Sequence, residues 1–408
     1  MNMRISILNS HYSPEEVGGA ERSVRWLAES LTQDGHDVTI ICLGRARTSE
    51  ILGGVKVERI ALRNIYYPTA AGSPSALTKL FWHGRDTFNA GMAGEVGRLL
   101  HDIQPDVLHT NTLSGFSTAV WSVAKAQRIP IVHTLRDYYL LCPNTAMYRQ
   151  GGPCNGRCHA CRVFSWPRQR LTANVQCAVG VSGYILERHL SEGCFPNAQR
   201  RVISNGYRAA VAPTDPPVGQ GVQFGFLGRL VPAKGLEMLI DAILELWYGG
   251  HPVRLIVAGA GSERYVSSLR ARCGSVPVQF LGHIPPADFF RQVHFTVIPS
   301  QWNEPFARVV IESYAHGVPV IASDAGGIPE VFKGPATGML FSSDSASDLL
   351  RCLRDAMNIG SGDHYRRLRT HSLEAAKTFV PERTAREYYE TYLAVLRDRH
   401  ERAVAIGG

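Results

Sequence analysis

Short apolar runs alternate with amphipathic segments along the first half of the chain. The segment at 20–35 places five apolar residues on one helical face and ends at Gly35, which suits a helix stop: Ala20, Val24, Leu27, Ala28 and Leu31. Buried strands are predicted at 3–10, 37–44, 106–111, 129–135, 177–182 and 201–206, with a further helix at 117–127. Strands that alternate with helices predict a parallel sheet covered on both faces.

A second alternating series follows a segment rich in Pro and Gly, AAVAPTDPPVGQG at 209–221, which is typical of a linker. Strands are predicted at 222–230, 253–259, 278–283, 295–300, 319–324 and 338–340, and helices at 236–247 and 307–317. One charged amphipathic helix is predicted from Pro381 onward. The fold class is therefore α/β, with two doubly wound Rossmann-like domains, 1–208 and 209–380, that face a cleft.

Composition narrows the class of protein. The chain has 408 residues, 45% of them hydrophobic, and it contains no apolar run long enough to span a membrane. Its N-terminus lacks the features of a signal peptide, so we expect a cytoplasmic protein whose nine cysteines are thiols or metal ligands. The net charge of +8 favours anionic partners, among them nucleotides, phosphorylated lipids, a membrane surface or nucleic acid.

Two cations follow the first strand of the second domain, in the segment GRLVPAKG at 228–235. Arg229 and Lys234 suit a diphosphate, because arginine can form a bidentate fork and lysine supplies a point charge. Gly18 and Gly19 occupy the corresponding place in the first domain, before a helix whose free N–H groups could face an anion. The alternatives are a solvated basic turn at 228–235 and an ordinary glycine turn at 18–19.

Two glutamates flank a predicted helix start in the segment NEPFARVVIES at 303–313. Pro305 suits the first helical turn, so Glu304 should project from the loop, and Glu312 should lie near the same side of the helix. The backbone N–H groups of Phe306, Ala307 and Arg308 would then face a phosphate or a sugar. We infer a nucleotide sugar with its hexose at Glu304, its diphosphate at the helix start and its ribose at Glu312. The alternative is a solvated surface helix.

These motifs together resemble those of glycosyltransferase family 4, a retaining group with the GT-B architecture. GGAERSV at 18–24 is similar to the family's N-terminal glycine loop, and GRLVPAKG to its phosphate-binding Arg and Lys. EPFARVVIE at 304–312 matches its E-x7-E motif, and GVPVIASDAGGIPE at 317–330 matches the segment after it. The resemblance covers nearly the whole chain. It implies a donor site on the C-terminal domain, an acceptor site on the N-terminal domain, catalysis without a metal or cofactor, and a final helix, 381–408, that crosses back to the first domain.

The chain departs from the family pattern at two places. Many members have glycine where Ala307 stands, and many have a histidine where Arg136 stands. That histidine is assigned to the donor sugar or the acceptor, so its role is open here. The acceptor-side candidates are His109, His133, Arg136 and Asp137, although a lone strand-end histidine is more often structural.

A cysteine-rich and arginine-rich segment interrupts the first domain. Cys142, Cys154, Cys158 and Cys161 either form a structural zinc site or remain free thiols, since their spacing is irregular. Residues 138–186 contain no Asp or Glu but hold five arginines, with Phe164 and Trp166 between them: Arg149, Arg157, Arg162, Arg168 and Arg170. This composition suits a phosphorylated acceptor or an anionic membrane surface, with nucleic acid a weaker alternative. The segment at 77–85 is a second candidate membrane face or an ordinary, partly buried helix.

The function expected is a metal-independent hexosyltransferase that moves a sugar, with retention, from a UDP- or GDP-sugar to a glycan or a polyprenyl-diphosphate-linked acceptor in cell-surface polysaccharide assembly. Arg229, Lys234 and Glu304 would act in catalysis. The expected place is the cytoplasm, peripheral at the inner face of the membrane. The alternatives are a GT-B sugar-nucleotide epimerase, a phosphorylase, or a non-catalytic nucleotide-sugar-binding protein.

Overall fold

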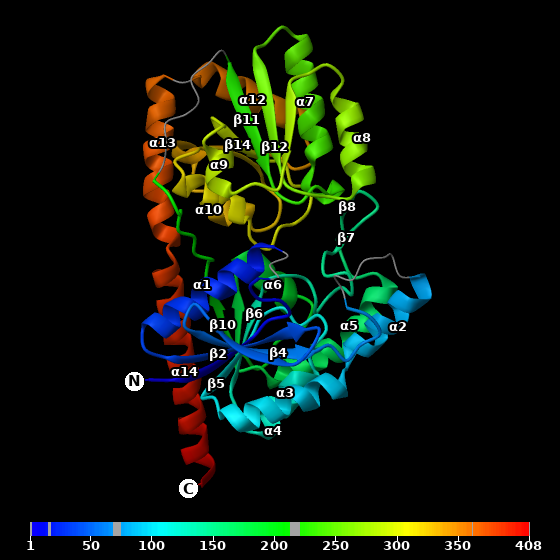
Figure 1. Cartoon of the computed structure of the whole chain (residues 1–408), viewed down its shortest axis with the longest axis vertical. Coiled ribbons are helices and arrows are strands. Elements are labelled where there is room, and N and C mark those ends of the chain that lie inside the picture. Colours follow the sequence, from blue (N-terminus) through cyan, green and yellow to red (C-terminus); the bar gives the residue numbers. More distant parts are fainter. Residues whose placement is uncertain (1, 15–17, 68–74, 213–220, 361, 408) are drawn as a thin grey trace. The chain divides into compact units, whose positions relative to one another are not determined.

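The computed structural model describes residues 2–14, 18–67, 75–212, 221–360 and 362–407 (Figure 1). Most of the predicted linker, 213–220, lies outside the described residues. The chain divides into two compact units. Unit 1 comprises Met1–Met147, Asn155–Asn205 and Pro381–Gly408, and unit 2 comprises Tyr148–Cys154 and Gly206–Val380. The chain therefore changes unit between 205 and 206, three residues before the predicted boundary, and its last helix belongs to unit 1.

Unit 1 is built on a sheet of eight described strands in the order β10-β9-β6-β5-β1-β2-β4-β3. All neighbouring pairs are parallel except β3 with β4. The strands are β1 (Arg4–Leu8), β2 (Asp37–Gly44), β3 (Thr48–Leu52), β4 (Val55–Ala61), β5 (Val107–Thr110), β6 (Ile131–Leu135), β9 (Cys177–Gly180) and β10 (Gln199–Val202). The sequence pattern did not reveal the antiparallel pair β3–β4, because β3 is mostly exposed and lacks a buried apolar run.

Helices cover both faces of this sheet (Figure 1). They are α1 (Gly19–Gln33), α2 (Ala76–Thr87), α3 (Ala90–Ile103), α4 (Ala119–Ala126), α5 (His159–Leu171), α6 (Gly183–Leu190) and α14 (Pro381–Gly407), with a 3-10 turn η1 (Thr172–Asn174). Apolar side chains of α1 and α14 pack in one core with those of β1, β2 and β4, which explains why the C-terminal helix belongs to unit 1.

Unit 2 contains a parallel sheet of six described strands in the order β13-β12-β11-β14-β15-β16. They are β11 (Val222–Leu227), β12 (Val253–Ala258), β13 (Val278–Gly282), β14 (Phe295–Ile298), β15 (Val320–Ser323) and β16 (Gly338–Phe341). Its helices are α7 (Leu236–Tyr248), α8 (Glu263–Cys273), α9 (Pro286–Phe290), α10 (Arg308–Ala315), α11 (Ile328–Val331), α12 (Ala346–Ile359) and α13 (Asp363–Ala376), with 3-10 turns η2 (Pro232–Lys234), η3 (Pro335–Thr337) and η4 (Lys377–Phe379). A two-stranded pair, β7 (Tyr148–Arg149) with β8 (Gly152–Pro153), also belongs to this unit.

The predicted α/β class is confirmed, and neighbouring strands are parallel in both large sheets except for the pair β3–β4. Most of these strands coincide with apolar runs of the sequence, which is why the pattern predicted them. Across the residues that the structure describes, no helix has the length and apolar character needed to cross a membrane.

Candidate active site

The candidate site of unit 2 lies at the carboxyl ends of β11, β14 and β15, which are neighbours in the sheet. The loops that follow these strands contain Arg229 and Lys234 after β11, Glu304 after β14, and Gly326 after β15. In an open parallel sheet, ligands bind at this edge. The topology therefore gathers residues that lie almost a hundred positions apart in the sequence.

Glu304 is a buried carboxylate with two partners. The Nζ atom of Lys234 lies 2.5 Å from Glu304 Oε1, and the hydroxyl of Ser300 donates a hydrogen bond of 2.7 Å to the same oxygen. The side chain of Glu304 is only 6% exposed, whereas that of Lys234 is 22% exposed and lies 5.3 Å from the centre of the Trp302 ring. Glu304 is thus held in a buried position, whereas the ammonium group of Lys234 remains accessible to solvent. Sequence reasoning missed Ser300 and Trp302, because neither belongs to a motif.

Two glycines allow the site loops to approach one another. A Cβ atom on Gly326, whose φ is +64°, would lie 2.5 Å from the backbone nitrogen of Glu304. A Cβ atom on Gly235, whose φ is +70°, would lie 1.9 Å from the carbonyl oxygen of Pro299. The backbone N–H of Gly327 also donates to the carbonyl of Glu304 at 2.7 Å. Both glycines are therefore needed for the backbone packing that holds Glu304 beside Lys234.

The surroundings of Arg229 differ from those of Lys234, which pairs with Glu304. The side chain of Arg229 is exposed, and within the described residues it has no carboxylate partner. It follows β11 directly and lies five positions before Lys234. A paired lysine and an unpaired arginine at one strand end suit a ligand that brings its own negative charge.

Glu312 lies on α10 and pairs within that helix. Arg308 donates to Glu312 Oε1 from Nε at 3.2 Å and from a terminal nitrogen at 3.0 Å, and the two side chains are 10% and 8% exposed. The helix begins at Arg308, so the prediction that Pro305 occupies its first turn is wrong: Ala307, with ψ of 84°, is not yet helical. The Arg308 amide also donates to the carbonyl of Phe306, which leaves it less suited to a phosphate than predicted.

His109 and His133 both lie inside buried strands of unit 1. His109 contacts the Tyr392 hydroxyl through Nδ1 at 2.7 Å and the Thr134 hydroxyl through Nε2 at 2.8 Å, so both ring nitrogens are engaged. His133 contacts the Thr110 hydroxyl at 2.9 Å, and burial lowers the pKa of His133 to about 3. These are the surroundings of structural histidines, and their acceptor role stays a prediction that this burial disfavours.

Arg136 and Asp137 lie just after β6 at the carboxyl edge of the unit 1 sheet. Arg136 donates to the side-chain oxygens of Asn111 at 2.7 Å and Asn205 at 2.6 Å. Asp137 accepts the Tyr139 amide at 2.8 Å, and desolvation of its carboxyl group raises the pKa of Asp137 to about 6. Of the four acceptor-side candidates, this partly exposed pair is the better placed for a ligand.

The sequence predicts that Gly18 and Gly19 precede a helix, and in the structure Gly18 lies directly before α1 and Gly19 is its first residue. The Gly18 amide, however, donates to the carboxylate of Glu21 at 2.9 Å. The carboxylate of Glu21 therefore already occupies part of the predicted anion site. Donor binding by these glycines therefore stays a prediction.

The four cysteines of the predicted zinc site divide between the units. Cys142, Cys158 and Cys161 belong to unit 1, and Cys154 belongs to unit 2. A hydrogen bond from Cys161 and the backbone amides of residues 144, 146 and 147 lower the pKa of Cys142 to about 6. In the described part of the chain, no group of three or more His, Cys, Asp or Glu side chains is arranged to hold a metal. The zinc site stays a prediction, which metal analysis of the purified protein would test.

The five arginines of residues 138–186 do not form one solvent-facing cluster, although the segment itself contains no acid. Arg168 is fully buried and pairs with Asp86 at 3.2 Å, and Arg157 pairs with Glu192 at 2.8 Å. Both acids come from outside the segment. Arg162 and Arg170 are exposed.

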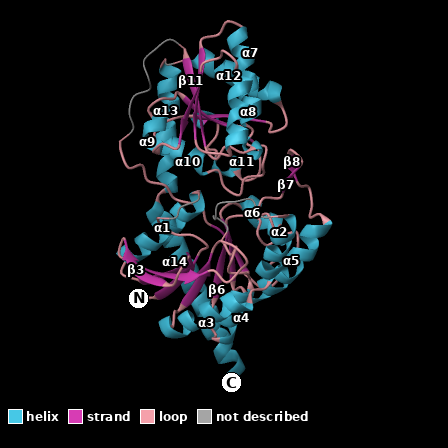
Figure 2. Cartoon of the chain, turned by 45° about the vertical axis from the view of Figure 1, so that its right-hand side comes forward, coloured by secondary structure: helices cyan, strands magenta, loops and turns pink. Residues whose placement is uncertain are grey.

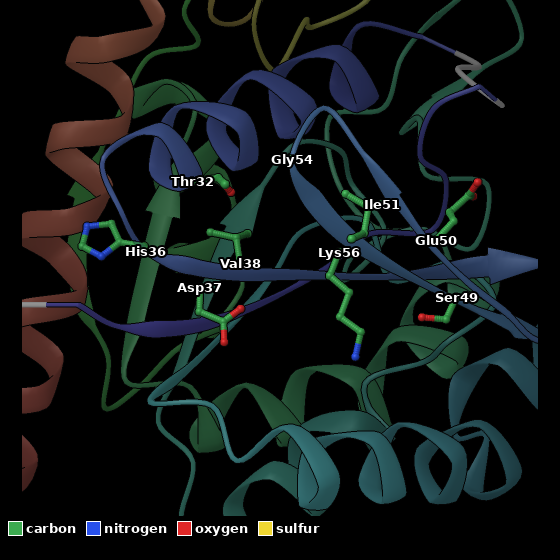
Figure 3. Close-up of a pocket in the computed structure, with 9 residues that line it drawn as sticks. All are labelled: Thr32, His36, Asp37, Val38, Ser49, Glu50, Ile51, Gly54 and Lys56. Carbon is green, nitrogen blue, oxygen red and sulfur yellow. The ribbon is translucent and has the colours of Figure 1, made fainter.

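A separate pocket lies in unit 1 and involves residues that the sequence did not single out (Figure 3). Its lining includes His36 and Asp37 at the amino end of β2, together with Glu50 and Lys56. This is the edge of the sheet opposite to the carboxyl ends where ligands of such folds bind. The pocket therefore does not enter the candidate site.

Comparison with known proteins assigns the family. The model described as Glycosyltransferase Family 4 matches residues 17–210, and the model described as Glycosyl transferases group 1 matches residues 216–374. An uncharacterized 42.6 kDa protein of the cps region of Klebsiella pneumoniae is 35% identical over 331 residues, which cover 81% of this chain and 87% of the relative. Glycogen synthase of Mycobacterium tuberculosis is 25% identical over 419 residues, which cover 98% and 96%.

Solved structures show the same fold. Sucrose-phosphate synthase from Thermosynechococcus elongatus superposes with a TM-score of 0.75 at 19% identity, covering 97% of this chain and 100% of that one. HepE of Anabaena in complex with UDP gives 0.72 at 19% identity, covering 96% and 100%. The chain therefore belongs to glycosyltransferase family 4 and has the GT-B fold, with a group 1 glycosyltransferase domain in unit 2.

Proposed function

We propose that the protein transfers a hexose, with retention of configuration, from a nucleotide sugar to a glycan or lipid-linked acceptor in cell-surface polysaccharide assembly. The observation that carries the proposal is the group formed by Arg229, Lys234 and Glu304 at the carboxyl ends of β11 and β14. Structural neighbours are described in complex with UDP, UDP-glucose or ADP, and one relative is encoded in a cps region. Both facts support a nucleotide-sugar donor and a polysaccharide product.

The charges of the site suit the departure of a nucleoside diphosphate. When the bond between the sugar and the β-phosphate breaks, negative charge grows on the phosphate and positive charge on the anomeric carbon. Arg229 and Lys234 would stabilise the phosphate, and this charge needs no divalent metal to balance it. The acceptor hydroxyl would attack from the face that the phosphate leaves and would lose its proton to that phosphate. The new bond then has the configuration of the old one.

Each glutamate would hold a different part of the donor. Glu304, kept in place by Ser300, would accept hydrogen bonds from the hexose hydroxyls while Lys234 turns toward the diphosphate. Glu312 would accept those of the ribose, with the Arg308 guanidinium 3.0 Å away to hold the carboxylate in position. Glu304 therefore positions the sugar and is not required as a nucleophile.

The experiment is a donor-turnover assay. The purified protein is incubated with UDP-, GDP- or ADP-hexoses and a membrane-lipid or oligosaccharide acceptor extract, with and without chelator, and nucleoside diphosphate release is measured. Acceptor-dependent release that is unchanged by chelator is expected, and Lys234→Ala should abolish it. Release that requires added Mg²⁺ or Mn²⁺ would contradict metal independence. Formation of an isomerised nucleotide sugar, or binding without turnover, would favour the epimerase or the non-catalytic alternative.

A further inference from the structure

Helices α2 and α5 of unit 1 are neighbours (Figures 1 and 2). They carry exposed apolar and cationic side chains that the proposed transfer reaction does not explain. Buried side chains join the two helices on the side that faces the core of unit 1. Asp86 of α2 and Arg168 of α5 are both 0% exposed and lie 3.2 Å apart, and the Arg168 guanidinium stacks 3.9 Å from the centre of the Tyr139 ring. The ring of His83 also meets that of Phe164 edge-on at 6.3 Å. The two helices therefore form one rigid platform.

The buried network fixes which faces point outward. On α2, Trp82 and Asp86 are buried, and on α5, Ser165 and Arg168 are buried. The opposite faces of both helices must then point away from the unit's core. Their exposed large apolar side chains recur at helical spacing: Leu77 (68%), Leu80 (50%), Phe81 (66%) and Phe88 (53%) on and directly after α2, and Val163 (58%) and Trp166 (56%) on α5. We call these residues, with the exposed cations beside them, the α2–α5 face.

The exposed charged side chains of the α2–α5 face are all cationic. The cations are Arg85 on α2, and Arg162 and Arg170 on α5. The sequences of the two helices contain a single acid, Asp86, and it is buried. Among the described residues, none of these three cations has a carboxylate partner, and Arg170 instead lies 4.3 Å from the centre of the Trp166 ring. The face therefore lacks the acidic side chains that normally balance surface cations.

We infer that the α2–α5 face docks on an anionic lipid bilayer. Exposed Leu, Phe and Trp side chains on a helix with Lys and Arg beside them suit insertion at the boundary between headgroups and acyl chains. The three cations complement anionic headgroups, and the Trp166–Arg170 stack combines an amphipathic ring with a cation at that level. This inference rests on the surface of unit 1 and does not depend on the proposed transfer reaction.

The test is vesicle flotation of the full chain without donor or acceptor. Vesicles of phosphatidylcholine are compared with vesicles that contain about one third phosphatidylglycerol, at low salt and at about 0.5 M salt. Binding to the anionic vesicles is expected to be at least about tenfold tighter, and to weaken with salt because the headgroup field is screened. Phe81→Ser with Trp166→Ser should abolish binding. Arg162→Gln with Arg170→Gln should weaken it about fivefold per cation.

Matched controls lie on unit 2. Tyr248 is 71% exposed on α7, and Arg270 lies 5.2 Å from the centre of the Phe280 ring, much as Arg170 does on Trp166. Tyr248→Ser and Arg254→Gln with Arg270→Gln should therefore leave flotation unchanged. All variants should keep the wild-type thermal transition, because every altered side chain is exposed.

Three outcomes would overturn the inference. The first is no preference for anionic vesicles, and the second is binding that the α2–α5 variants do not alter. The third is a dimer in light scattering that Phe81→Ser with Trp166→Ser dissociates, which would make a second copy the occupant. Failure of the proposed transfer reaction would leave flotation unaffected, so the two proposals can fail separately.

Discussion

The proposed roles of Glu304 in binding the hexose and of Glu312 in binding the ribose can be tested with single substitutions. Glu304→Gln should weaken binding of the intact nucleotide sugar by roughly tenfold to a hundredfold, which is the range for a lost hydrogen bond to a charged group. It should spare the bare nucleoside diphosphate, because Lys234 loses its carboxylate partner and gains freedom to meet phosphate. Glu312→Gln should weaken both ligands, because both contain the ribose. Isothermal calorimetry measures the four affinities.

Stability controls separate binding from folding in this experiment. Glu312→Gln removes the carboxylate charge that Arg308 contacts at 3.0 Å, which can lower stability by itself. Each variant is therefore compared with wild type by thermal unfolding before calorimetry. Equal losses for both ligands in both variants would contradict the assignment of hexose to Glu304 and ribose to Glu312.

A second residue-scale prediction concerns pH. The native pKa of His133 is lowered to about 3 by burial, below its ordinary value of 6.5. As pH falls below 6.5, the unfolded chain binds this proton first, so the stability that neutral His133 contributes is present above 6.5 and is lost toward 3. Between pH 7 and pH 5 the loss should be about 2 kcal/mol.

Urea unfolding of wild type and His133→Gln at both pH values measures this contribution. The variant should lose about 2 kcal/mol less between pH 7 and pH 5 than wild type. Asp137 acts with the opposite sign, since a pKa raised to about 6 costs stability as pH rises, but it is present in both proteins and cancels. Identical pH dependence in the two proteins would show that native His133 can be protonated at little cost.

The sequence predicted those site residues that belong to recognisable motifs. Arg229, Lys234 and Glu304 lie in the loops that follow unit 2 strands, and Glu312 lies on the helix α10, as expected. Pattern alone could not show that Lys234 contacts Glu304, because that contact joins residues 70 positions apart. It also could not show that Arg168 is buried, since its partner Asp86 lies 82 positions away and outside the acid-free segment.

At the scale of elements, the C-terminal helix gives a prediction for unit 1. The hydroxyls of Tyr388 and Tyr392 on α14 contact Thr134 at 2.9 Å and His109 at 2.7 Å, inside the sheet. Tyr392→Phe keeps the ring but leaves one nitrogen of buried His109 without a partner. The free energy of unfolding of unit 1 should fall by about 1–3 kcal/mol.

Denaturant unfolding of Tyr392→Phe, followed by far-ultraviolet circular dichroism, measures this cost. The matched control is Tyr389→Phe on the same helix, because the ring of Tyr389 stacks on His36 at 4.8 Å and its hydroxyl is not part of that network. No difference between the two variants would mean that the His109–Tyr392 contact contributes nothing to stability.

The regular elements were predictable where burial imposes an apolar pattern. Every described strand of the unit 2 sheet falls on a predicted run. For β11, β12, β14 and β15 the reason is burial, because parallel strands covered on both faces are largely apolar. Strand β3 and the start of α10 were not predictable in the same way. Exposed strands carry no apolar signal, and a helix start depends on the local backbone at Ala307, which residue pattern does not determine.

At the scale of the whole molecule, the path of the chain predicts two unfolding events. Each unit has its own apolar core, and, apart from the short segment Tyr148–Cys154 of unit 2, the chain forms unit 1 up to Asn205, then unit 2, and returns to unit 1 with α14. A nucleoside diphosphate that binds unit 2 should stabilise that unit. At a hundred times its Kd the gain should be about 2.7 kcal/mol.

Differential scanning calorimetry of the full chain can assign the two events. Saturating nucleoside diphosphate should raise the midpoint of the unit 2 transition and leave the unit 1 transition in place. Tyr388→Ala, which removes a buried ring from the core that α14 shares with α1, should lower the unit 1 transition and leave the nucleotide shift of unit 2 intact. A single transition that moves as a whole with either change would show that the units unfold together despite their separate cores.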